Sequence, residues 1–255
     1  MKRLTVLLLA LVMLIAAACA QTSLDGGTVE LGASPDADPV DMNTQAPVKA
    51  GYGLSPQVKV MASVAYLFEG EKGSILYGAA EYKNTGDCPV TVSNASFEFN
   101  LGGLRYKEET TPALNAYDIV LPGETSYVAA WIEKEDIEYK EGNEVAVSVQ
   151  LSPARSLDTP LKLTAGQLYI AQNYPGFCTL SGSLTNESMD DCDLNMIYSA
   201  FYDKKGDLLG VWNFSKNVLL APGDEKAFVV HMRALPIPDL AQNTSEIKTV
   251  GFGIG

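Results

Sequence analysis

The sequence predicts an all-β protein in which two similar β-sandwich domains follow a short apolar leader. Three observations support this fold class. Apolar and polar residues alternate along several segments, as in Val145–Leu151; clusters of Gly, Pro, Asn and Asp separate these segments; and one set of landmarks occurs twice along the chain. A period of two gives each strand one buried and one exposed face. Helical periodicity is nearly absent.

Residues 1–18 have the pattern of a signal peptide. Lys2 and Arg3 form a short basic start, and an uncharged apolar segment over residues 4–18 ends in three alanines. This segment is shorter than the roughly 20 apolar residues that cross a bilayer. We therefore predict that the leader is cleaved and does not stay as an anchoring helix.

Cys19 follows the leader directly, and Ala16–Cys19 resembles a lipobox, the processing motif of bacterial lipoproteins. Leu is usual in the motif where Ala16 stands. The resemblance implies that Cys19 carries the lipid and that the mature protein is extracytoplasmic, held at the bacterial cell membrane by its acyl chains. Cleavage after Ala20 also fits the small-residue rule, and it would release a soluble secreted protein.

The segment 19–53 is rich in Gly, Ser, Pro, Asp and Thr, which predicts a disordered tether between the lipid and the folded domains. The net charge of the whole chain is -13, and loss of Lys2 and Arg3 with the leader makes the mature protein more acidic still. This charge argues against nucleic acid as a partner and against docking on anionic lipid headgroups.

The rest of the chain contains an internal repeat with an offset of about 100 residues. The matching landmarks are Asn84 with Asn186, Pro122 with Pro222, and Glu144 with Glu246. They delimit a first domain over 54–153 and a second over 160–255, with a short linker between them. The Asn and Pro-Gly-acid landmarks are interpreted as turns. About seven short strands in each copy are typical of an immunoglobulin-like (Ig-like) sandwich.

The second copy resembles the FxLYD domain, an Ig-like module of bacterial exported proteins. The resemblance is carried by Ala200–Asp207, with Gly182–Asn186 before it and Ala221–Asp224 after it. Phe201 stands where Leu is usual. In the first copy, Asn84–Asp87 and Leu121–Thr125 resemble a related Ig-like domain of bacterial lipoproteins. These resemblances imply tandem Ig-like domains, and they imply no common catalytic residues.

His231 is the only histidine, so a Ser-His-Asp triad or a histidine metal site would depend on it. Matching the two copies places His231 opposite Trp131, on the solvent side of a strand. No Gly-x-Ser-x-Gly or His-x-x-His pattern accompanies it. The acidic clusters also lack the spacing of a calcium loop. We therefore expect no enzyme, no metal site and no cofactor.

Three cysteines, Cys88, Cys178 and Cys192, remain once Cys19 is set aside. An odd number allows at most one intrachain disulfide among them. Cys88 and Cys192 are predicted to occupy similar loop positions in different domains. Cys178 and Cys192 belong to one domain and are the better candidate pair.

A candidate binding face lies on the strand that contains Tyr127, Ala129 and Trp131. These residues share a face if Val128 and Ala130 point inward, and exposed aromatic side chains are a common feature of binding surfaces. The alternative is that this face packs on the other domain or on a neighbouring strand.

The sequence thus predicts a non-enzymatic lipoprotein of the cell envelope that binds or holds a protein or another envelope component. Two alternatives stay open. The protein could be an accessory subunit of an envelope complex, or a secreted enzyme of unrecognised type. Fold alone does not decide among them.

Overall fold

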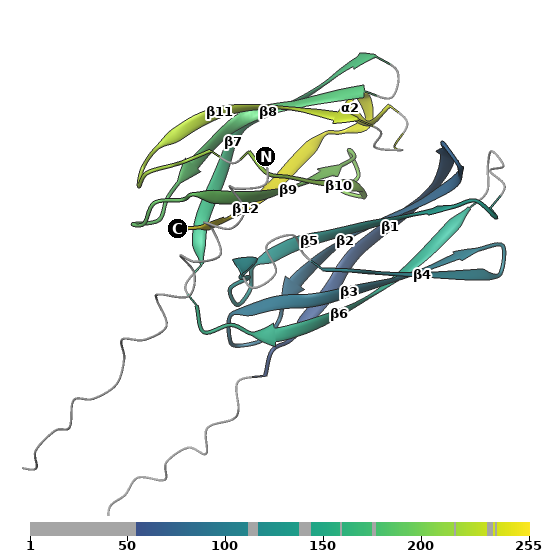
Figure 1. The fold of residues 1–255 in the computed structure, drawn as a ribbon, viewed down its shortest axis with the longest axis horizontal. Coiled ribbons are helices and arrows are strands. Elements are labelled where there is room, and N and C mark those ends of the chain that lie inside the picture. The colour runs from purple at the N-terminus through teal and green to yellow at the C-terminus, as the bar shows by residue number, and fades with distance from the viewer. Residues whose placement is uncertain are drawn as a thin grey trace, which may run out of the picture. The chain divides into compact units, whose positions relative to one another are not determined.

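The computed structural model describes residues 55–111, 117–137, 144–158, 160–174, 177–216, 218–233, 237 and 239–255. The predicted signal peptide, Cys19 and the tether lie outside these residues. Gly51–Gly255 forms one compact unit. The described part is almost entirely strand, with one short helix, so the predicted all-β class is confirmed (Figure 1).

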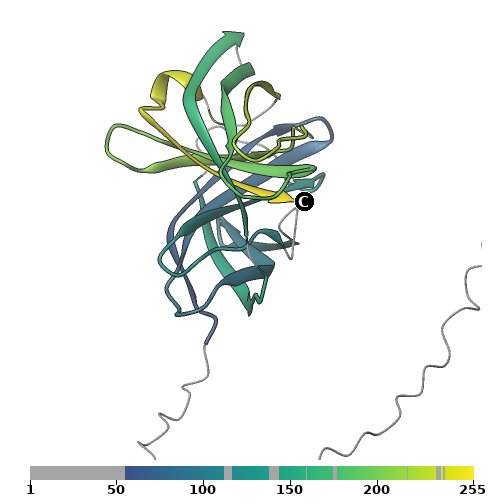
Figure 2. The same cartoon turned by 90° about the vertical axis from the view of Figure 1, so that its left-hand side faces the viewer.

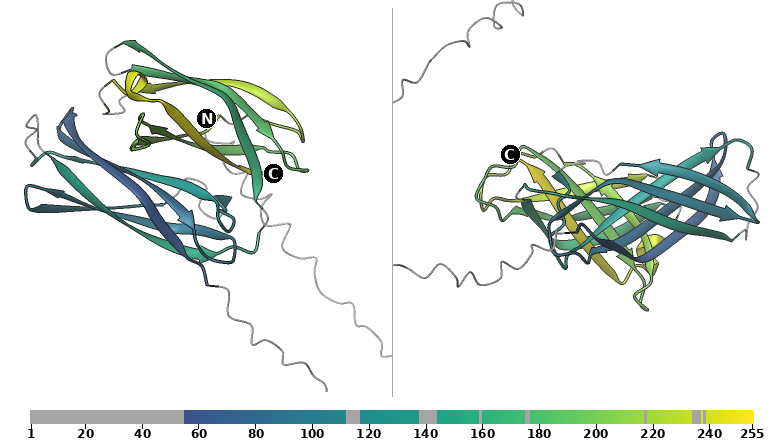
Figure 3. Two further views of the ribbon diagram at one scale, coloured as in Figure 1. Left: turned by 180° about the vertical axis from the view of Figure 1, so that it is seen from behind. Right: turned by 90° about the horizontal axis from the view of Figure 1, so that it is seen from below.

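The first six strands are β1 (Val58–Gly70), β2 (Gly73–Asn84), β3 (Val90–Leu101), β4 (Leu104–Thr110), β5 (Thr125–Lys134) and β6 (Val145–Arg155). The remaining elements are β7 (Leu161–Tyr174), β8 (Phe177–Asn186), β9 (Leu194–Tyr202), β10 (Leu208–Phe214), β11 (Glu225–Arg233), α2 (Leu240–Asn243) and β12 (Glu246–Ile254). We call β1–β6 the first repeat and β7–β12 the second repeat. In Figures 2 and 3 the first runs from blue to teal and the second from green to yellow.

Both repeats have the same strand order. The first repeat has two antiparallel three-stranded sheets, β1-β2-β5 and β4-β3-β6. The second repeat has one sheet in the order β10-β9-β12-β7-β8-β11, in which the corresponding two triplets are joined where β12 pairs with β7. The sequence repeat is therefore a repeat of topology.

The core of the first repeat lies between its two sheets. Phe97 and Phe99 of β3 are fully buried, and an added Cβ on Gly78 of β2 would lie 2.8 Å from the Phe99 ring. This close approach explains why β2 has a glycine there, since any larger side chain would separate the sheets. In β6, burial alternates along Val145–Leu151 as the sequence predicts.

The sheet of the second repeat folds over so that its two halves pack against each other. Phe214 of β10 and Phe228 of β11 belong to strands at opposite ends of the sheet, yet their ring centroids are 5.4 Å apart. Figure 1 shows β8 and β11 as a layer over β9 and β10. Leu180, Ile197 and Phe201 are fully buried in this repeat. The described residues thus form layered antiparallel sheets in both repeats.

The repeated asparagines are structural, as their turn chemistry predicts. Asn84 is fully buried, and its Nδ2 donates hydrogen bonds to the Cys88 and Val120 carbonyls, both at 2.8 Å. Its Oδ1 accepts from the Gly86 amide at 3.0 Å. One side chain therefore ties together the end of β2, the following loop and the strand bridge at Val120.

Asn186 makes the equivalent contacts in the second repeat. Its Nδ2 donates to the Asp190 carbonyl at 2.8 Å and to the Leu220 carbonyl at 3.0 Å, and its Oδ1 accepts from the Ser188 amide at 3.0 Å. The matching Pro-Gly-acid turns place Gly123 at φ 83° and Gly223 at φ 80°. Glycine adopts these positive angles without steric cost, which confirms the turn interpretation.

Candidate functional site

A row of three aromatic side chains crosses the outer face of sheet β1-β2-β5. Tyr66 of β1 pairs with Tyr77 of β2, which in turn pairs with Trp131 of β5. Successive ring centroids are 6.3 and 6.5 Å apart. We call Tyr66, Tyr77 and Trp131 the aromatic row. The predicted inward side of β5 is confirmed, because Val128 and Ala130 are buried in the hydrophobic core.

Two members of the aromatic row bind the backbone of β10 in the second repeat. The Tyr66 hydroxyl donates to the Leu209 carbonyl at 2.9 Å. The Tyr77 hydroxyl donates to the Val211 carbonyl at 2.7 Å and accepts from the Val211 amide at 2.8 Å. Since β10 is an edge strand, no strand among the described residues pairs with these backbone groups on that side. The tyrosine hydroxyls supply the hydrogen bonds that a strand would otherwise make.

Burial keeps these hydroxyls protonated. It raises the pKa of Tyr66 above its ordinary value, and it raises the pKa of Tyr77 much further. Tyr77 is 2% exposed. Both side chains therefore remain hydrogen-bond donors throughout the physiological pH range.

The third member of the row, Trp131, lines a cavity of about 530 Å³. Small-molecule sites in proteins span about 300–1,000 Å³. The lining residues come from β2, β4, β5 and β10, and they are Tyr77, Glu108, Thr110, Ala129, Ala130, Trp131, Val211, Trp212 and Asn213. We call this space the tryptophan cavity, because both tryptophans of the chain line it.

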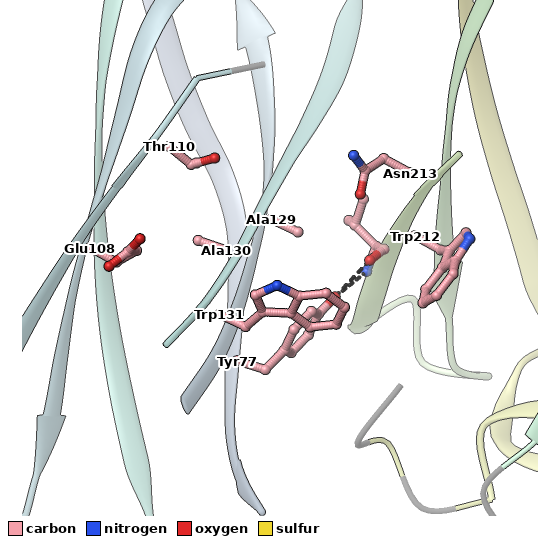
Figure 4. A pocket seen from close by; sticks show the side chains of 9 residues that line it. Tyr77, Glu108, Thr110, Ala129, Ala130, Trp131, Trp212 and Asn213 are labelled. Atoms are coloured by element: carbon pink, nitrogen blue, oxygen red, sulfur yellow. Dashed lines mark hydrogen bonds between the residues drawn. The ribbon is translucent and has the colours of Figure 1, made fainter. Parts of the chain in front are cut away.

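The tryptophan cavity combines flat apolar surface with short polar side chains. The Trp131 side chain is 54% exposed, whereas Trp212 is half-buried. Figure 4 shows the Trp131 indole with Glu108 and Thr110 to one side and with Trp212 and Asn213 to the other. A carboxylate, a hydroxyl and an amide thus surround an accessible aromatic ring. These groups can accept and donate hydrogen bonds to a polar ligand.

Of the two residues predicted for the binding face, only Trp131 is exposed. Tyr127 is 3% exposed and lies against the second repeat, where its hydroxyl is 3.4 Å from that of Tyr202. The Tyr202 hydroxyl donates to Glu81 Oε2 at 2.7 Å. This corrects the prediction for Tyr127, since the face packs on the other repeat at that position. The prediction missed Glu108, Trp212 and Asn213, which strand alternation alone does not connect to Trp131.

A second contact zone between the repeats lies around Asp118. The Tyr198 hydroxyl donates to Asp118 Oδ2 at 2.5 Å, and both residues are buried. Nearby, Lys162 and Glu124 form an exposed ion pair of 2.6 Å beside a cavity of about 290 Å³. The lining of this smaller cavity is largely apolar and has no tryptophan.

His231 occupies the position in the second repeat that Trp131 has in the first. It pairs with Thr179, just as Trp131 pairs with Tyr77. His231 is exposed, as predicted, and its Nδ1 lies 3.3 Å from Thr179 Oγ1. Within the described ranges, no three His, Cys, Asp or Glu side chains are grouped to hold a metal ion.

The structure does not form the disulfide suggested for Cys178 and Cys192. Both are free thiols, as is Cys88. Cys178 lies on β8 and pairs with β11, whereas Cys192 precedes β9 and forms a bridge with Leu220. The predicted equivalence of Cys88 and Cys192 is also corrected: Cys192 corresponds to Val90, which forms the matching bridge with Val120.

Two comparisons with known sequences found no match. No family model matches the chain, and no curated protein matches it. In the part of the chain that the structure describes, no helix is long and apolar enough to cross a membrane.

Weak likenesses exist among solved structures. Red sea bream transglutaminase matches with 12% identity and a TM-score of 0.21, over 69% of this chain and 27% of that one. A beta-glucuronidase from glycoside hydrolase family 2 matches with 12% identity and a TM-score of 0.21, over 73% of this chain and 24% of that one. The chain therefore spans about a quarter of these proteins, and such low TM-scores carry no argument about its function.

Proposed function

We propose that this protein is a non-enzymatic lipoprotein of the bacterial cell envelope that binds an envelope component in the tryptophan cavity. One observation carries the proposal: both tryptophans of the chain line one cavity, and one of them, Trp131, is 54% exposed beside Glu108 and Asn213. An accessible aromatic ring that lines a cavity together with polar side chains is a common feature of ligand-binding sites.

The sequence supports the proposed location of the protein at the cell envelope. The basic start at Lys2 and Arg3, the apolar segment 4–18 and the lipobox-like Ala16–Cys19 favour export and lipidation. A lipid on Cys19, followed by the tether 19–53, would hold the folded unit near the membrane surface while leaving its faces accessible. Such an arrangement suits a protein that captures or positions another component of the envelope.

The repeat comparison supports a specialised site in the first repeat. At the positions of Tyr77 and Trp131, the second repeat has Thr179 and His231. Tyr77 makes the contact with β10, so its place in the first repeat alone has a structural reason. Trp131 is exposed and lines the tryptophan cavity, so it is the member of the row that a binding task of the first repeat explains.

The test is sedimentation with cell envelopes isolated from the organism that makes the protein. The secreted Cys19→Ser protein is used so that acyl chains contribute nothing to binding. We expect it to sediment saturably with the envelopes, and we expect Trp131→Ala in the same background to weaken binding by about 1–3 kcal/mol. Tyr169→Ala is the matched control, because Tyr169 is an exposed aromatic residue on a strand outside the cavity (66% exposed).

Equal sedimentation of the Trp131→Ala protein and its parent would contradict the proposal. Folding of each variant is checked by its thermal unfolding midpoint, since a folded variant that has lost binding identifies a binding residue. Trp131 is half in solvent, so its replacement removes little core packing.

A further inference from the structure

The tryptophan cavity opens where three edge strands come together. β4, β5 and β10 each stand at the end of their sheet order, and each contributes lining residues. Edge strands can bind an extended peptide through their free backbone groups. The ligand class therefore depends on how much of that backbone is free.

On β10 few backbone groups are free to bind a peptide. Tyr66 and Tyr77 already hydrogen-bond to Leu209 and Val211, the alternate residues that face away from β9. Asn213 is the next residue in this alternation, and β10 ends at Phe214. An added strand needs several successive backbone pairs, and one residue cannot provide them. The aromatic row thus blocks strand addition along β10, and on this side the cavity offers a ligand side chains in place of free backbone groups.

Those side chains fit a sugar ring. A pyranose has a face of C–H groups that packs on a flat aromatic ring, and its hydroxyls project from the rim as both donors and acceptors. Trp131 offers the accessible ring, while Glu108, Thr110 and Asn213 offer a carboxylate, a hydroxyl and an amide around it. The volume of about 530 Å³ lies within the range of small-ligand sites.

The charge of the lining indicates which kind of sugar. Among the described residues that line the tryptophan cavity, Glu108 is the one that is charged, and the whole chain has a net charge of -13. A uronate or a phosphorylated sugar would meet this carboxylate, and the described lining holds no cation to compensate. We therefore infer that the tryptophan cavity binds a neutral carbohydrate, with one sugar ring stacked on Trp131 and its hydroxyls hydrogen-bonded by Glu108 and Asn213. This inference rests on the proposed function and names the ligand class of the same site.

The experiment uses the protein's own fluorescence. Because both tryptophans line the cavity, all tryptophan emission reports on this site. The secreted Cys19→Ser protein is titrated with cellotetraose, maltotetraose, mannotetraose and chitotetraose as neutral probes. Tetragalacturonate is the anionic probe, and blocked tetra-alanine is the peptide probe. We expect a saturable change in emission with at least one neutral sugar and none with the anionic or peptide probes.

Variants then assign the contacts for the sugar that binds. Trp131→Ala should weaken sugar binding about tenfold or more. Trp131→Phe should lose less affinity for the sugar, because a smaller ring remains for it to stack on. Trp212 still reports in both variants. Glu108→Gln keeps the shape of the side chain but removes its charge. This variant should bind the neutral sugar more weakly, and it should also bind tetragalacturonate. Tyr169→Ala should bind as the parent does.

No saturable change with any neutral sugar overturns the inference, and so does saturation by blocked tetra-alanine alone. These failures are distinct from failure of the proposed function. If envelope sedimentation depends on Trp131 while the sugars have no effect, the site is a binding site for another ligand class. If sedimentation does not depend on Trp131, both proposals fall together.

Discussion

The Tyr77 hydroxyl makes two hydrogen bonds to one residue of the other repeat, donating to the Val211 carbonyl at 2.7 Å and accepting from the Val211 amide at 2.8 Å. A neighbouring β-strand would make the same pair of bonds. Tyr77 therefore joins the repeats and caps an edge strand at the same time. It also forms one wall of the tryptophan cavity.

We predict that Tyr77→Phe lowers the free energy of unfolding by about 1–3 kcal/mol, because it leaves the amide and carbonyl of Val211 buried without partners. Tyr66→Phe is the matched control. Tyr66 makes one hydrogen bond to Leu209 and is only partly buried, so its loss should cost about 0.5–1.5 kcal/mol. Urea unfolding of the two variants measures the difference. Equal effects would argue against the strand-like role of Tyr77.

We predict that Asn84→Ala and Asn186→Ala each destabilise the protein by about 1–3 kcal/mol. Each removes a fully buried amide that donates two hydrogen bonds to loop carbonyls. Asn100→Ala should cost much less, because the Asn100 side chain is exposed and accepts a solvent-accessible hydrogen bond from the Gly103 amide. The thermal unfolding midpoints compare the three. A shift for Asn100→Ala as large as the others would show that burial is not the cause.

Stability should fall at alkaline pH. Burial raises the pKa of Tyr127 to about 12, whereas an unfolded tyrosine has a pKa of about 10. The unfolded chain therefore loses its proton first, and the contribution of Tyr127 is fully present below about pH 10 and lost as the pH rises toward about 12. Unfolding midpoints at about pH 8 and about pH 11 measure this loss, and Tyr127→Phe should reduce it. A midpoint that is constant between these pH values would contradict the assignment.

The repeat and the β class follow from the sequence because both depend on local patterns. Alternation along Val145–Leu151 sets which face of β6 is buried, and Gly123 and Gly223 supply the positive φ angles of matching turns. These features are independent of how the repeats contact each other. The same local logic correctly places His231 on the exposed side of its strand.

The site follows from the sequence only in part, because it depends on contacts between distant segments. Alternation puts Tyr127 and Trp131 on one face, but it does not reveal that β9 covers Tyr127 while Trp131 remains open. Trp212 and Asn213 reach the cavity through the docking of β10, which no pattern in β5 encodes. The sequence holds one indication that Trp212 belongs to the site, namely that the chain has only two tryptophans.

The proposed lipidation of Cys19 predicts how the protein partitions. The wild-type protein should enter the detergent phase of a Triton X-114 extract, and Cys19→Ser should move it to the aqueous phase, because the acyl chains provide the membrane affinity. Mass spectrometry of the wild-type N-terminus is the second readout. A mature chain that begins at Gln21 without lipid would show that the protein is secreted in soluble form.

The central claim, that the tryptophan cavity is occupied by an envelope component in the cell, is tested most directly by photocrosslinking in living cells. A photoreactive phenylalanine analogue replaces Trp131 in one strain and Tyr169 in another. These positions are both exposed aromatic sites, and only Trp131 lines the cavity. We predict a discrete crosslinked species of higher mass from position 131 and none from position 169. Identical crosslinking patterns at the two positions, or no crosslink at position 131, would contradict the account.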